Sequence, residues 1–180
     1  NNTNIINPVY TPGPGDINSG SVVLTLTAIG NSTCPSVYDD MILTIITFPT
    51  VNAGNNYTIC SNQIFTVSTS SVSNNNGQLW GTNGDGNFND NSLLNPIYTP
   101  GPIDISSGTV TLTITAIGIS PCVDITDNMI LTIDPEPTAN ADGNATICEG
   151  DNYIFNGATV SNNNGQLWGT NGDGNFNDNS

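Results

Sequence analysis

The sequence predicts an all-β protein built of tandem antiparallel β-sandwich repeats, and three observations lead to this fold class. First, residues 72–92 recur unchanged as residues 160–180, an offset of 88 residues. Second, short segments alternate between apolar and polar residues, which is typical of strands with one buried face. Third, Asn-Gly and Asp-Gly pairs at 83–86 are strong turn signals, and no segment shows the 3.6-residue period of a helix.

The 88-residue offset holds along the whole chain without a gap. Tyr10 matches Tyr98, Cys34 matches Cys122, Cys60 matches Cys148 and Trp80 matches Trp168. Proline-containing stretches at 48–54 and 134–140 are the best unit boundaries, because proline ends a strand ladder and stiffens a linker. We therefore predict the back half of a sandwich repeat at 1–48, a complete repeat at 49–136 and the front half of the next repeat at 137–180.

Individual strands follow from the alternation. In 109–116 the apolar residues fall on one face and threonines on the other, and 21–28 repeats this pattern. Other expected strands are 57–60, 63–68, 77–82, 97–98 and 128–133. A half unit cannot bury its own sheet face. We expect either that the sequence is a window on a longer chain, or that neighbouring chains complete the halves head to tail.

Composition excludes several functions. The chain has 15 acidic residues, no Lys, Arg or His, and a net charge of −15. Nucleic-acid binding requires cations that replace phosphate counterions, and histidine or lysine catalysis has no residue to perform it. We therefore expect no nucleic-acid partner and no enzyme activity. No apolar run is long enough to span a membrane.

The segment from Trp80 to Gly86, then Tyr98-Thr99-Pro100 and the strand 110–116 resemble a PKD or Ig-like sandwich domain. With Thr58-Ile59-Cys60, Pro121-Cys122 and 129–133 added, the chain resembles the tandem repeats of giant surface adhesins in Bacteroidota, including gliding-motility adhesins of the SprB type. The resemblance implies an Ig-like or PKD-like sandwich, export by the type IX route and a position on the cell surface.

One cysteine pair occurs in each period. We predict a disulfide between Cys60 and Cys122, with Cys34 and Cys148 pairing outside the sequence. The alternatives are Cys34–Cys60 and Cys122–Cys148, which would link successive units. A disulfide implies an oxidising, extracellular compartment.

Oxygen-bearing side chains alternate in the turn after Trp80, and Asn83, Asp85, Asn87 and Asp90 are weak calcium candidates. The segment lacks the glycine and glutamate of an EF-hand loop. Hairpin turns stabilised by these side chains are the alternative, and no other cofactor is expected.

Trp80, Tyr98 and Trp168 are expected in the core, although Trp80, Phe88 and Tyr98 could instead form a sugar-stacking platform.

The sequence predicts a stalk or spacer that extends an adhesive tip from the cell, with identical repeats as neighbours. The alternatives are a repeat that binds surface polysaccharide and a filament subunit completed head to tail by strand exchange.

Overall fold

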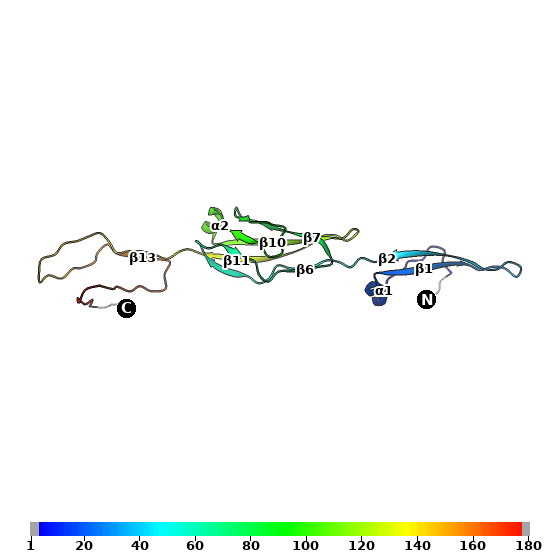
Figure 1. Ribbon diagram of the computed structural model, residues 1–180, viewed down its shortest axis with the longest axis horizontal. Helices are drawn as coiled ribbons and strands as arrows, with labels where there is room; N and C mark the ends of the chain where they lie inside the picture. The colour runs from blue at the N-terminus through cyan, green and yellow to red at the C-terminus, as the bar shows by residue number, and fades with distance from the viewer. Residues whose placement is uncertain (1–3, 178–180) are drawn as a thin grey trace.

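A computed structural model describes residues 4–177; residues 1–3 and 178–180, which belong to the predicted terminal halves, lie outside the described residues. Three parts follow one another along the longest axis (Figure 1). We call them the N-terminal part (4–48), the central unit (49–136) and the C-terminal part (137–177). The regular structure of the described residues is mainly β-strand, with only two short helices, which confirms the predicted all-β class.

Two layers of strands form the central unit. The larger sheet has the order β4 (Tyr57–Cys60), β11 (Ile125–Asp134), β10 (Thr109–Gly118) and β7 (Asn75–Thr82). Its pairs are antiparallel, except that β4 runs parallel to β11. The other strands form the set β5 (Phe65–Thr66), β9 (Ile97–Thr99) and β8 (Asn87–Phe88), and the pair β3 (Thr50–Asn52) and β6 (Ser71–Ser73).

The core lies between these layers. Every second residue of β10 is buried, as the alternation in the sequence predicts. The adjacent strand β11 contributes Met129, Leu131 and Ile133. From the opposite side, Phe65, Val67 and Tyr98 complete the core. Burial of these apolar side chains at roughly 25 cal/mol per Å² is the main favourable term for the unit.

A short helix, α2 (Pro102–Ser107), precedes β10, and α1 (Pro14–Ser19) repeats it in the N-terminal part. The sequence predicts no helix here, because six residues are too few to show a helical period. The signals are instead local. Proline stands at the first helical position, and Gly108 ends the helix with a φ of 74°, which glycine adopts without strain.

Each terminal part keeps the local pairing of the matching half of the central unit. The hairpin of β1 (Ser21–Ala28) and β2 (Val37–Thr44) pairs Leu24 with Met41, as Leu112 pairs with Met129. In the C-terminal part, β12 (Thr138–Asn140) and β13 (Thr159–Ser161) repeat the β3–β6 pair.

The terminal parts differ from the central unit in burial. Leu26 is 61% exposed, whereas its equivalent Ile114 is fully buried. Met41 is 55% exposed and its equivalent Met129 only 2%. The apolar faces of the terminal parts therefore lack the layer that covers them in the central unit. Neither helix of the described residues has the length and apolar character to cross a membrane.

Candidate functional site

The most highly connected polar group of the central unit is the carboxylate of Asp104, which is 1% exposed. It accepts hydrogen bonds from the Tyr98 hydroxyl at 2.6 Å and from the backbone N–H groups of Gly86 and Gly101, each at 3.0 Å. The N–H of Asp85 adds a fourth at 3.2 Å. Hydrogen bonds from several donors offset the loss of hydration that burial of a charge entails.

Asp85 makes the reciprocal contact. Its Oδ1 accepts the N–H groups of Ile103 at 3.1 Å and Asp104 at 3.2 Å, in the first turn of α2. The turn 84–86 and the start of α2 are therefore held together by two carboxylates. Glycine is required at this junction, because a Cβ on Gly84 would lie 1.7 Å from Asp104 Oδ1. Asp85 is among the residues predicted from the sequence, whereas Asp104 is not. The signal for Asp104 is the Gly-Pro-x-Asp pattern of 101–104, which recurs in 13–16 with Gly15 at the variable position.

The calcium candidates have structural hydrogen bonds in this fold. Asn83 Oδ1 accepts the N–H of Thr111 at 2.8 Å. Asp90 accepts the N–H and the hydroxyl of Ser92, and these hydrogen bonds lower the pKa of its carboxyl group. Asn83, Asp85 and Asp90 thus serve separate backbone segments, and no hydrogen bond of Asn87's side chain joins it to them. Among residues 4–177, no group of three or more Cys, Asp or Glu side chains is placed to hold a metal ion.

The Tyr98 hydroxyl limits the stability of the central unit at alkaline pH. Burial, together with the hydrogen bond to Asp104, raises the pKa of the Tyr98 hydroxyl from 10.0 to about 12. Between these two values the folded state keeps a proton that the unfolded state releases, so the stabilisation is complete below pH 10 and is lost as the pH rises toward 12.

We therefore expect the urea midpoint of the central unit to fall between pH 10 and 12, and to fall less steeply in Tyr98→Phe. A midpoint series monitored by circular dichroism measures this effect. Tyr38→Phe, in the exposed N-terminal hairpin, is the matched control and should follow the parent protein. Identical slopes for Tyr98→Phe and the parent would show that this hydroxyl does not set the limit.

The aromatic residues expected in the core are buried in the central unit. Trp80 and Tyr98 are both inaccessible, and the indole Nε1 donates to the Leu94 carbonyl at 3.2 Å. Phe88 lies between them, with ring centroids 5.9 Å from Trp80 and 4.9 Å from Tyr98. This arrangement offers no open sugar-stacking platform. In the C-terminal part, Trp168 is half-buried and stacks on Phe155 at 4.2 Å.

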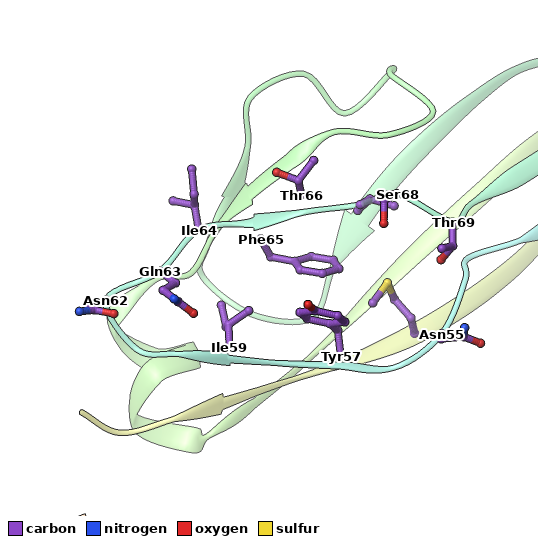
Figure 2. A pocket seen from close by; sticks show the side chains of 12 residues that line it. Asn55, Tyr57, Ile59, Asn62, Gln63, Ile64, Phe65, Thr66, Ser68 and Thr69 are labelled. Atoms are coloured by element: carbon purple, nitrogen blue, oxygen red, sulfur yellow. The ribbon is translucent and has the colours of Figure 1, made fainter. Parts of the chain in front are cut away.

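An open groove of about 680 Å³ lies between β4 and β5 (Figure 2). The rings of Tyr57 and Phe65 face each other in it, with centroids 5.3 Å apart, and Tyr57 is 58% exposed. Asn62 and Gln63 lie at one end of the groove and Asn55 and Thr69 at the other. The next repeat has Ala145 in place of Tyr57, so the groove is not reproduced from unit to unit.

All four cysteines are free thiols, and the structure does not support the predicted Cys60–Cys122 disulfide. Cys60 pairs with Asp134, the last residue of β11, whereas Cys122 lies three residues before that strand begins. Ten strand residues at roughly 3.3 Å each separate them by about 30 Å. A disulfide requires Cα atoms within about 7 Å. The sequence does not reveal this separation, because it does not show that the cysteines flank opposite ends of one strand.

The joints between the parts share one geometry. Asn74 Nδ2 donates to the Phe48 carbonyl at 3.4 Å, and its equivalent Asn162 donates to the Glu136 carbonyl at 3.1 Å. Next to the joint, the hydroxyls of Thr50 and Ser73 are 2.7 Å apart. Those of Thr138 and Ser161 are 2.6 Å apart. The two joints use the same contacts although their linkers differ in sequence.

No family model matches the chain, and no curated protein does. Among solved structures, the crystal structure of human mucin-like protocadherin EC1-2 is similar over 71% of this chain and 73% of that chain. The sequence identity is 10% and the TM-score 0.37. A similarity of this size indicates neither family membership nor function.

Proposed function

We propose that the chain is a series of structural units from a long extracellular surface adhesin or filament, which act as a stalk that extends an adhesive tip from the cell. The observation that carries this proposal is the serial arrangement. The parts lie end to end, and the long strands of the central unit run along the common axis (Figure 1). A recurring joint connects one part to the next.

This geometry suits a mechanical role. A unit whose strands have about eight to ten residues extends the stalk by roughly 35–45 Å, including its end loops. Tension along the axis acts on the β-ladder hydrogen bonds in shear, so many bonds resist it together. The net charge of −15, with no basic residue to form an ion pair, keeps neighbouring stalks apart by repulsion.

The resemblance to repeats of Bacteroidota adhesins supports a place on the cell surface, and with it export by the type IX route and a part in adhesion or gliding. We propose no catalytic role, since the polar groups of the central unit that we describe are engaged in holding its turns and helix together.

The test is electron microscopy of the intact native polypeptide together with its denatured mass. A stalk predicts rods with beads spaced by about 35–45 Å and a mass far above the 18.7 kDa of this chain. Compact particles with a denatured mass of 18.7 kDa would contradict the proposal.

Glycan arrays probed with the chain and with Tyr57→Ala test the polysaccharide alternative, which predicts binding that this substitution removes.

The exposed faces of the terminal parts favour a second candidate, a filament subunit. The C-terminal part corresponds to the front half of a unit and the N-terminal part to its back half. One copy could therefore complete the next, as the two halves pack in the central unit. A denatured mass of 18.7 kDa with native rods would select this candidate, because noncovalent assembly would then build the same array.

A further inference from the structure

We infer that successive units are cross-linked by a disulfide between the Cys60 position of one unit and the Cys122 position of the unit that follows it. This inference rests on the proposed serial arrangement. It replaces the pairing within one unit, and it differs from the Cys34–Cys60 and Cys122–Cys148 alternatives.

The first observation concerns the end of the central unit that adjoins the next unit. Cys60 ends β4 and is the register partner of Asp134 at the end of β11. The next residue, Ser61, donates its N–H to the Asp134 carbonyl at 2.8 Å. Cys60 is therefore fixed beside the linker that leads into the next unit.

The second observation concerns the end of the central unit that adjoins the preceding unit. Cys122 lies in the loop between β10 and β11, which points back toward the N-terminal part (Figure 1). Its thiol donates to the Ile46 carbonyl at 3.5 Å and lies 3.9 Å from the Thr47 carbonyl. Cys122 is therefore fixed against the linker from the preceding unit.

The repeat brings the two observations together, because Ile46 and Asp134 occupy the same position 88 residues apart. At this position the carbonyl oxygen accepts two hydrogen bonds. One comes from the N–H of the residue after Cys60 in its own unit, and the other comes from the Cys122 thiol of the following unit. A carbonyl has two lone pairs and can serve both. The equivalent hydrogen bonds of Asn74 and Asn162 occur at both joints, which supports the same arrangement at each. The two cysteine positions thus converge on one peptide group.

The other pairings do not meet this condition. Cys34 lies in the β1–β2 loop, which extends away from the central unit that carries Cys60 (Figure 1). The segment between β12 and β13, which contains Cys148, extends away from the central unit that carries Cys122 (Figure 1). The cross-link itself requires a disulfide donor as oxidant. The two thiols are oxidised to a disulfide, and the donor takes up the two electrons and two protons as two thiols.

The test uses a fusion in which residues 1–176 are followed by a second copy of 1–180, which preserves the period. Cys34→Ser and Cys122→Ser in the first copy, with Cys60→Ser and Cys148→Ser in the second, leave four of the eight cysteines. After equilibration with oxidised and reduced glutathione, free thiols are counted. Pepsin peptides are then mapped without reduction, since the chain has no Lys or Arg for trypsin.

We expect two disulfides and no free thiol. Cys60 of the first copy should pair with Cys34 of the second, and Cys148 of the first with Cys122 of the second. The four remaining cysteines have different neighbouring sequences, so the peptides identify each pair. Pairing within units predicts one disulfide, between Cys148 of the first copy and Cys34 of the second, and two free thiols, and finding that would overturn the inference. The Cys34–Cys60 and Cys122–Cys148 alternatives have lost one partner of every pair and predict four free thiols, which would overturn it as well. The frictional ratio of the same fusion separates the two proposals, because a compact fusion would contradict the serial arrangement itself.

Discussion

Asp104→Ala is expected to lower the free energy of unfolding of the central unit by about 3–5 kcal/mol, because each buried donor left without a partner costs roughly 1–3 kcal/mol and such losses are not fully additive. The substitution removes the acceptor of the Tyr98 hydroxyl and of three backbone N–H groups. It also frees the turn 84–86 from α2. Urea unfolding followed by Trp80 fluorescence, in a Trp168→Phe background, measures the effect in this unit.

Asp16→Ala is the matched control. Asp16 has the same position in the repeat and accepts from the Tyr10 hydroxyl at 2.5 Å and from Gly13 N–H at 2.9 Å, but the first bond is exposed to solvent and the second is only partly buried. We expect the central unit to keep its stability within about 0.5 kcal/mol. Equal effects of the two substitutions would show that the stabilisation does not come from burial of the network.

Ile114→Ala is expected to destabilise the central unit by about 2–5 kcal/mol, the range for removal of a buried isoleucine side chain that leaves a cavity. Ile114 is fully buried between the layers. The equivalent Leu26→Ala, at a side chain that is 61% exposed, should change this stability by less than about 1 kcal/mol. The same urea experiment compares the two variants.

A substitution of Leu26 also tests whether the front half of a neighbouring unit covers the N-terminal part. Where a neighbouring front half covers the N-terminal part, Leu26 becomes a core residue like Ile114. Leu26→Asp should therefore abolish head-to-tail association at high protein concentration, as sedimentation velocity would show, while the central unit stays folded. Undiminished association of Leu26→Asp would show that this face is not the one that neighbouring units cover.

The strands were largely predictable because one buried face imposes a period of two, as the Val110 to Ala116 alternation shows. The helix α2 was not, since a six-residue helix depends on Pro102, Asp104 and Gly108 rather than on a pattern of apolar residues. Asp85 was selected as a possible metal ligand because sequence alone does not show which backbone donors a turn will meet. The prediction of a Cys60–Cys122 disulfide was wrong for a similar reason. The spacing of the two cysteines within a period carries no information on which end of the sheet each cysteine reaches.

Small-angle X-ray scattering of the chain and of the two-copy fusion tests most directly whether 88-residue sandwiches are joined in a line. The fusion adds 176 residues, or two repeat lengths. Linear joining predicts a maximum dimension larger by about 70–90 Å and an unchanged cross-sectional radius of gyration. A wider cross-section, with little increase in length, would mean that the units fold back on one another and that the stalk account is wrong.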